Sequence, residues 1–193
     1  MTVPLRDSPD ADLMTGPPER FGELFERYSD QLYDYCARRV GRQLAEDLVA
    51  DTFAAAFAHR DRYDVTVPNA RPWLFGILAN LLHKHRRAEA RGWRALARAG
   101  RDPLDGARPL DESFADEVGD RLDARAATRS LAKALAAMPH EQREVLLLHV
   151  WACLDYPDLA LALALPPGTV RSRLHRAKAK LRRALPDHYA PST

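Results

Sequence analysis

The segment 154–185 constrains the fold more than any other part of this chain, because it has the pattern of a helix-turn-helix. The sequence PPGT at 166–169 interrupts a run rich in alanine and leucine, and proline is favoured in the first turn of a helix. Apolar residues then recur at helical spacing, at Val170, Leu174, Ala177 and Leu181. The pattern predicts a short helix, a turn of about three residues and a second helix.

The second of these helices is strongly basic. Residues 166–185 include no acid. Its cationic and histidine side chains are Arg171, Arg173, His175, Arg176, Lys178, Lys180, Arg182 and Arg183. A solvated basic helix that closes a bundle is the simpler interpretation. The compact apolar face of the preceding helix, which includes Leu159 and Ala160, favours instead a helix that enters the major groove of DNA.

The net charge of +2 conceals a strong charge pattern along the 193 residues. Residues 84–101 carry seven Lys or Arg side chains and one acid, Glu89, whereas residues 102–125 carry eight acids and three arginines. Two basic segments with an acidic one between them predict two nucleic-acid contacts joined by a spacer.

The apolar pattern predicts an all-α protein of two small helical domains. Helical spacing runs through three early segments, 21–36, 45–57 and 72–82. No segment alternates as a strand does. We therefore expect a first domain over 18–97, a flexible linker over 98–121 and a second domain over 122–187. Within the second domain, a helix begins at Pro139 ahead of the helix-turn-helix.

The ends of the chain and its two cysteines carry less signal. Residues 1–17 contain prolines and aspartates but no apolar core segment. We expect a disordered leader there, neither a signal peptide nor a membrane span, and a short tail at 188–193. Cys36 and Cys153 lie in apolar helical patterns, which predicts two buried free thiols in a reducing cytoplasm.

Five segments, taken in order, resemble the bacterial RNA polymerase sigma factors of the extracytoplasmic-function (ECF) group of the sigma-70 family. They are AEDLVADTF at 45–53, RPWLFGILAN at 71–80, LAAMP at 135–139, QREVLLL at 142–148 and PPGTVRSRLHRA at 166–177. The resemblance implies sigma region 2 in the first domain and sigma region 4 in the second. It also implies a function, which is to bind core RNA polymerase and direct transcription initiation at minus-ten and minus-thirty-five promoter elements.

The resemblance places the polymerase contact on the second helix. The implied contacts with a coiled coil of the beta-prime subunit are Glu46, Asp47, Leu48 and Asp51. Carboxylates beside an apolar patch suit a partner surface that carries arginines. Acids near the start of a helix are also favoured by its dipole alone, so a solvated helix is the simpler alternative. Ala50 stands where the family often has glutamine.

The minus-ten element is assigned to the third helix, the loop before it and the basic residues after it. The implied contacts are Tyr63, Asn69, Trp73, Asn80, His83, Lys84, Arg86 and Arg87. A displaced strand needs pockets or stacking surfaces for its bases and cations for its backbone. Trp73 lies in an apolar stripe, so a core position is its alternative. No metal site is expected from His83 and His85, which lack ligand partners at suitable spacing.

The minus-thirty-five element is assigned to the basic helix. The implied contacts are Thr169, Arg171, Ser172, Arg173, His175, Arg176 and Lys178. The first turns of a recognition helix face base edges, so Arg171, His175 and Arg176 are candidates for base readout together with Ser172. An arginine–guanine pair contributes about 1–3 kcal/mol of discrimination. Arg173 and Lys178 suit phosphates, which add affinity without sequence preference.

Two residues depart from the family pattern in the first helix of the motif and the turn after it. Leu161 replaces a polar residue, and an exposed leucine there is a candidate surface for an anti-sigma protein. Ala164 replaces the glycine of the turn. If that position needs a left-handed backbone, alanine costs about 1–2 kcal/mol.

Two other functional classes are alternatives for this sequence. A stand-alone helix-turn-helix regulator remains the alternative, although a promoter-melting helix would be superfluous in a repressor. A recombinase would need a nucleophile or a carboxylate–metal cluster, and the sequence displays neither. We therefore expect a cytoplasmic, non-catalytic protein without cofactor or small-molecule substrate. Its expected partners are the beta-prime and beta subunits of core polymerase, promoter DNA and an anti-sigma factor.

Overall fold

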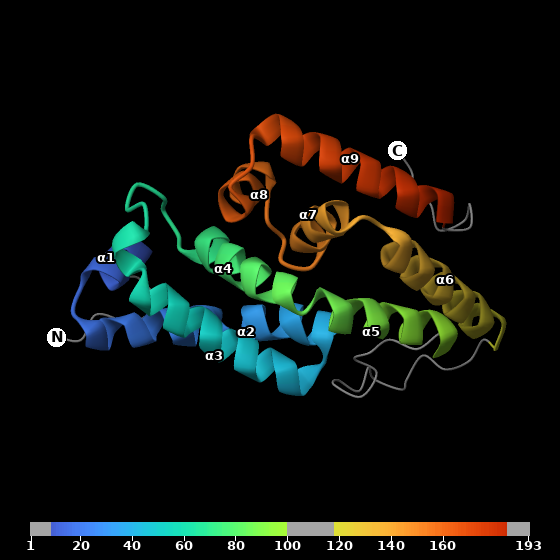
Figure 1. The fold of residues 1–193 in the computed structure, drawn as a ribbon, viewed down its shortest axis with the longest axis horizontal. Helices are drawn as coiled ribbons and strands as arrows, with labels where there is room; N and C mark the ends of the chain where they lie inside the picture. Colours follow the sequence, from blue (N-terminus) through green and yellow to red (C-terminus); the bar gives the residue numbers. More distant parts are fainter. Residues whose placement is uncertain (1–8, 100–117, 185–193) are drawn as a thin grey trace.

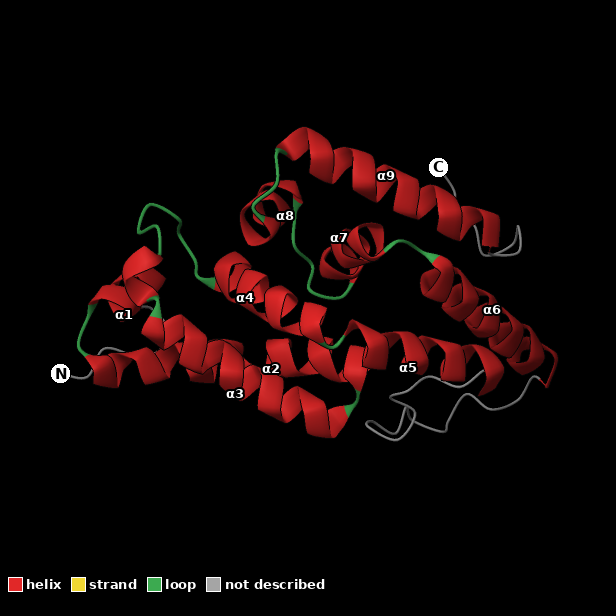
Figure 2. Ribbon diagram, in the orientation of Figure 1, coloured by secondary structure: helices red, strands yellow, loops and turns green. Residues whose placement is uncertain are grey.

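The computed structural model describes residues 9–99 and 118–184. Throughout these two ranges the regular structure is helical and contains no strand (Figure 2). The predicted all-α fold is confirmed. The predicted linker and the C-terminal tail fall largely outside the described residues.

The N-terminal unit is built around a pair of long helices. Its α-helices are α1 (Asp10–Thr15), α2 (Gly22–Val40), α3 (Arg42–Ala58), α4 (Arg71–Lys84) and α5 (Arg86–Ala99). Short 3-10 turns occur at Pro18–Phe21 and Arg60–Arg62. Gly41 joins α2 to α3 with a φ of 91°, a backbone region that favours glycine. Leu24, Leu32 and Tyr35 of α2 are buried in the core that α3 and α4 complete.

The structure corrects the expected disordered leader. Residues 10–15 form α1, in which Leu13 and Met14 are fully buried. The Asp10 carboxylate accepts hydrogen bonds from the Tyr28 hydroxyl at 2.5 Å and from the backbone N–H of Ala70 at 2.6 Å. A helix of this length leaves too few apolar positions for its period to be recognised in the sequence. The remainder of the expected leader, residues 1–8, lies outside the described residues.

The C-terminal unit consists of α6 (Val118–Ala137), α7 (His140–Val150), α8 (Tyr156–Leu163) and α9 (Pro167–Ala184). Pro139 precedes α7 directly, as the sequence predicts. The basic cluster does not simply continue the third helix, because the chain leaves helical geometry at His85 and α5 begins afterwards. Helix α6 begins four residues before the predicted start of the second domain.

The two units pack against each other along two helix pairs. Helix α5 lies against α6, and α8 lies against α4 (Figure 1). Gly76 allows the second approach, because a Cβ atom there would lie 2.4 Å from the carbonyl oxygen of Ala162. Only glycine permits backbones to come this close. The first helix of the helix-turn-helix therefore rests on α4.

Candidate nucleic-acid and polymerase interfaces

The turn of the helix-turn-helix begins with a residue in the left-handed region of the backbone. Asp155 caps α8 by accepting a hydrogen bond from the N–H of Asp158 at 2.9 Å. Ala164 ends α8 in the left-handed region, with φ 49° and ψ 46°. The N–H of Leu165 then donates to the carbonyl of Ala160 at 3.0 Å. Alanine thus occupies a position that favours glycine, which costs about 1–2 kcal/mol.

Helix α9 divides its side chains between two faces. Val170, Leu174 and Ala177 are buried against the rest of the unit. On the other side the structure exposes Arg171, His175 and Arg176. This division follows from the helical spacing of the apolar residues. The three exposed side chains can reach a partner without any rearrangement of the helix.

The other predicted contacts of α9 are half-buried: Thr169, Ser172, Arg173 and Lys178. The Ser172 hydroxyl donates to the carbonyl of Thr169 at 3.0 Å, which ties it to its own helix. The Lys178 ammonium lies 3.4 Å from Nε2 of His149 in α7. Both side chains therefore have a structural partner, whereas Arg171 and Arg176 have none within the described residues.

The acidic edge of α3 is a surface, but one predicted contact is not part of it. Glu46, Asp47 and Asp51 are exposed, and Ala50 lies exposed among them. Leu48 is only 2% exposed and belongs to the core. It falls on the apolar stripe of α3 rather than on the acidic one, so its side chain is unavailable to a partner.

The loop before α4 is more buried than a base-binding loop was expected to be. Tyr63 is 6% exposed, and its hydroxyl donates to the carbonyl of Val67 at 2.8 Å. Burial raises the pKa of Tyr63 to about 12. Its ring packs edge-on against half-buried Trp73, with centroids 5.6 Å apart. The side-chain oxygen of Asn69 is buried and has no hydrogen-bond partner within the described part of the chain.

The polar end of α4 and the start of α5 are open to solvent. Asn80, His83, Lys84 and Arg87 are exposed. The ring of His83 packs edge-on against His140 of α7, with centroids 4.9 Å apart. Arg86 is the first residue of α5, and its side chain lies outside the described set. The exposed residues predicted to contact the minus-ten element therefore form a basic surface beside the boundary between the units.

A buried ionic cluster joins the two units, and the sequence did not lead us to predict it. The Arg39 guanidinium donates to both oxygens of Glu144 at 2.7 and 2.8 Å and to Glu89 at 2.9 Å. Tyr35 donates to Glu144 at 3.0 Å, and Arg143 lies 3.4 Å from the second oxygen of Glu89. All five side chains are buried. Arg39 lies on the apolar stripe of α2. A charged residue at such a position indicates a buried ion pair, and this was the signal in the sequence.

Comparison with known proteins decides the family. The family model "Sigma-70 region 2" matches residues 24–92, and "Sigma-70, region 4" matches residues 128–181. ECF RNA polymerase sigma factor SigL of Mycobacterium tuberculosis is 31% identical, over 84% of this chain and 86% of SigL. SigW of Bacillus subtilis is 26% identical, over 89% of this chain and 92% of SigW. The chain belongs to the ECF sigma factors. It directs promoter-specific transcription initiation and binds DNA through its helix-turn-helix.

Solved structures agree with this assignment of the sigma factor. CnrH in complex with the cytosolic domain of CnrY superposes with a TM-score of 0.56 at 27% identity, covering 90% of this chain and 92% of CnrH. RpoE bound to the anti-sigma factor NepR from Bartonella quintana has the same TM-score at 24% identity, covering 86% and 96%. The second similarity concerns the fold alone.

Electrostatics set the protonation of the cluster in the sigma factor. Burial alone would raise the pKa of Glu89, but the charge and hydrogen bond of Arg39, with help from Arg143, hold that pKa below its ordinary value. Burial lowers the pKa of His140, which lies 3.5 Å from Glu144. At neutral pH the cluster thus contains a charged Glu89 carboxylate and a histidine that resists protonation.

Of the two thiols of the sigma factor, Cys36 is buried as predicted and Cys153 is not. Cys36 is fully buried, and burial raises its pKa to about 12. Cys153 is exposed, because α7 ends at Val150 and the residue adopts a φ of 49° in the following turn. Within the described ranges no helix is long and apolar enough to cross a membrane, and no three ligand-type side chains gather for a metal ion.

Proposed function

We propose that three surfaces of this sigma factor carry its function. The acids of α3 dock on core polymerase, the end of α4 with its loop and α5 binds the minus-ten element, and α9 reads the minus-thirty-five element. The assignment rests on α9, whose apolar residues are buried while its first turns present Arg171, His175 and Arg176 outward. We assign regions 2 and 4 to residues 18–97 and 122–187.

In the minus-thirty-five contact, the exposed arginines read bases and the half-buried residues position the helix. Arg171 and Arg176 have planar guanidinium groups that can pair with both acceptors of a guanine. Arg173 and Lys178 supply phosphate contacts at the edges. Thr169 and Ser172 lie at the start of the helix, where their bond to each other orients the first turn.

In the polymerase contact, Glu46, Asp47 and Asp51 face arginines or lysines of the beta-prime coiled coil. Leu48 supports this surface from the core instead of touching the partner. Exposed charges of this kind set the association rate and the register of docking. Ala50 offers contact area but no hydrogen bond.

In the minus-ten contact, the cations bind the backbone of the displaced strand and the loop receives a base. Lys84 and Arg87, with Arg86 and His83, follow the strand, and Asn80 adds a polar contact. The unpaired oxygen of Asn69 is available to a base edge. Tyr63 and Trp73 hold the loop in shape through their ring contact.

The compact arrangement is a resting state in this proposal. Helix α8 lies on α4 through the close approach at Gly76, so region 4 must leave α4 before both promoter elements are bound. The two solved relatives are complexes with CnrY and with the anti-sigma factor NepR, and we propose an anti-sigma partner here. Leu161, which is 53% exposed, is the candidate contact; unchanged partner binding in Leu161→Glu would remove it. The protein performs no catalysis itself and acts in the cytoplasm, where polymerase and chromosome meet.

Transcription with purified bacterial core polymerase on a library of candidate promoters tests the proposal. We expect discrete new start sites that disappear when Arg171 and Arg176 both become alanine. The matched control changes Arg182 and Arg183, which are equally exposed at the far end of α9, and it keeps the same start sites. Sequence-specific DNA binding without stimulated initiation would indicate a stand-alone regulator.

A further inference from the structure

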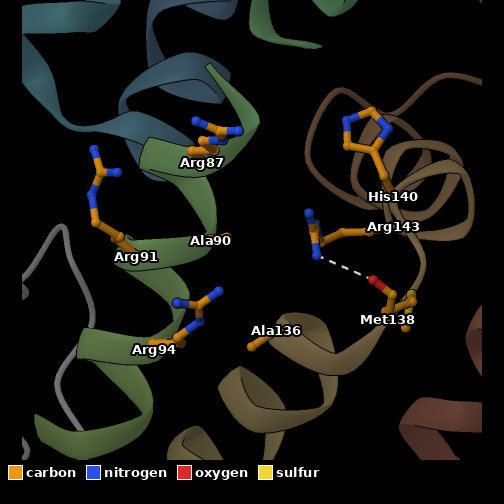
Figure 3. A pocket seen from close by; sticks show the side chains of 8 residues that line it. All are labelled: Arg87, Ala90, Arg91, Arg94, Ala136, Met138, His140 and Arg143. Atoms are coloured by element: carbon orange, nitrogen blue, oxygen red, sulfur yellow. Dashed lines mark hydrogen bonds between the residues drawn. The ribbon is translucent and has the colours of Figure 1, made fainter. Parts of the chain in front are cut away.

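A cationic cavity lies at the boundary between the two units. It measures about 540 Å³ and opens between α5 and the junction of α6 with α7 (Figure 3). Five of its eight lining residues are arginine or histidine, and none is acidic: Arg87, Arg91, Arg94, His140 and Arg143. A volume of this size is typical of sites that hold a small organic ligand.

The arginines that α5 contributes to the cavity have no neutralising acid within residues 9–99 and 118–184, whereas Arg143 lies 3.4 Å from Glu89 and His140 lies 3.5 Å from Glu144. Arg87, Arg91 and Arg94 recur at spacings of four and three, so they follow one another along about 10 Å of α5. Within the described ranges none of the three pairs with a carboxylate. The nearby acid Glu89 is already engaged by Arg39 at 2.9 Å.

Arg143 supplies a fixed anchor at the inner wall. It is 5% exposed, and its Nη1 donates to the carbonyls of Leu135 and Met138 at 2.9 and 3.2 Å. Its Nε is buried and has no hydrogen-bond partner within the described residues. Figure 3 shows Arg94 on the opposite wall extending toward the gap, whereas Arg91 lies on the outer side of α5. Two arginines thus approach the cavity from different units.

Apolar groups complete the lining. Ala90 comes from α5, Ala136 from α6, and Met138 from the connection to α7. A methionine side chain adapts readily to a flat or irregular apolar surface. The combination of guanidinium groups with an apolar floor suits a molecule that has several phosphates and an organic part.

We propose that this cavity binds a small polyphosphate anion, either a nucleoside polyphosphate or an inorganic polyphosphate. Guanidinium forks match phosphate oxygens in pairs, and the charge of several phosphates balances the uncompensated arginines. The cavity walls come from both units, so the anion binds only when the units are packed together. By linkage, the ligand stabilises this packing and delays the release of α4. This regulatory input goes beyond the proposed promoter and polymerase contacts.

Calorimetric titration of the full chain with ATP and with tripolyphosphate, at physiological salt, tests the site without polymerase or promoter DNA. We expect saturable binding of one anion per chain, weakened at least about tenfold by Arg94→Glu, because charge-assisted hydrogen bonds are lost. The control is Arg98→Glu, one turn further along α5, which makes the same change of charge outside the cavity. If ATP binds more tightly than tripolyphosphate, the apolar part of the cavity contacts the nucleoside. If the two bind equally, the ligand class is inorganic polyphosphate.

A second measurement reports on closure. Trp93 of α5 and Trp151, which follows α7, lie with ring centroids 5.8 Å apart across the boundary. Their fluorescence should report the separation of the units as denaturant is added. ATP or tripolyphosphate should raise the denaturant concentration at the midpoint of this transition in the parent protein but not in Arg94→Glu. Equal loss of binding in both glutamate variants would overturn the proposal. So would Arg94-dependent binding of single-stranded DNA with no binding of either phosphate probe.

Discussion

Helices α4 and α9 are both expected to bind promoter DNA, but they differ in how accessible they are in this structure. Helix α9 presents Arg171 and Arg176 to solvent. Helix α4 exposes its polar end, yet it is covered by α8 where Gly76 meets Ala162. In this arrangement the helix proposed to read the minus-thirty-five element is accessible, and the helix proposed to bind the minus-ten element is restricted. We therefore expect control of this sigma factor to act first on region 2.

The largest expected effect comes from breaking the buried ionic cluster that joins the two units. Arg39→Met leaves Glu89 and Glu144 buried without their main counter-charge. Removing one partner of a buried ion pair lowers the free energy of unfolding by about 3–5 kcal/mol. Denaturant unfolding followed by circular dichroism measures the change. Arg98→Met, on an exposed side chain, should shift stability by less than about 0.5 kcal/mol. Equal effects of the two variants would show that the cluster is not buried in solution.

A smaller change separates α4 from α8 directly. Gly76→Ala places a Cβ atom against a backbone oxygen that cannot move aside, so we expect a destabilisation of roughly 1–3 kcal/mol. Transcription at limiting sigma concentration should rise, because α4 is released more easily. In Gly92→Ala the new Cβ lies 3.8 Å from the carbonyl oxygen of Arg39. This control should gain up to about 1 kcal/mol in stability. Matching behaviour of the two variants would contradict the α4–α8 packing.

A third variant tests the turn that precedes α9. Ala164→Gly relieves the left-handed alanine in the turn, and thermal unfolding should show a gain of about 1 kcal/mol. Promoter specificity should not change, because the exposed arginines are untouched. Ala50→Gly, at an exposed helical position of α3, is the control and should lose about 1 kcal/mol. A loss at both positions would show that the turn is not left-handed.

The smallest expected effect is a dependence on pH. Burial lowers the pKa of His140 in the folded protein, and the nearby Arg39 and His83 lower it further. Glu144 and Glu89 act in the opposite direction, but they do not outweigh burial. The unfolded chain therefore takes up a proton first as the pH falls through about 6.5, and stability decreases there. Unfolding measured between pH 7.5 and 5.5 should show this slope in the parent protein and not in His140→Gln. An unchanged slope in the variant would assign it to another group.

Amphipathic patterns made much of this fold predictable. The left-handed backbone at Ala164 was considered only as a condition, on the basis of family resemblance, and the structure contains it. Val170, Leu174 and Ala177 identified the buried face of α9 through their spacing. Such features are local, so spacing along the chain determines them. The exposed acids of α3 were predictable for the same reason.

Features that depend on distant segments were not predictable. Helix α1 is stabilised by hydrogen bonds that the Tyr28 hydroxyl and the backbone N–H of Ala70, both distant in the chain, donate to Asp10. The same holds for Arg39 and Glu144, whose pairing exists only when the two units meet. Leu48 and Tyr63 were assigned to surfaces from family resemblance, but packing buries both of them.

The turn after α7 makes the natural protein convenient for chemical labelling. Cys153 is exposed there. The other cysteine of the chain, Cys36, is fully buried, and burial raises its pKa to about 12. A maleimide dye reacts with accessible thiolate and therefore attaches at one position without mutagenesis. That position lies beside the helix-turn-helix, so a single dye can follow region 4 in single-molecule experiments on unaltered protein.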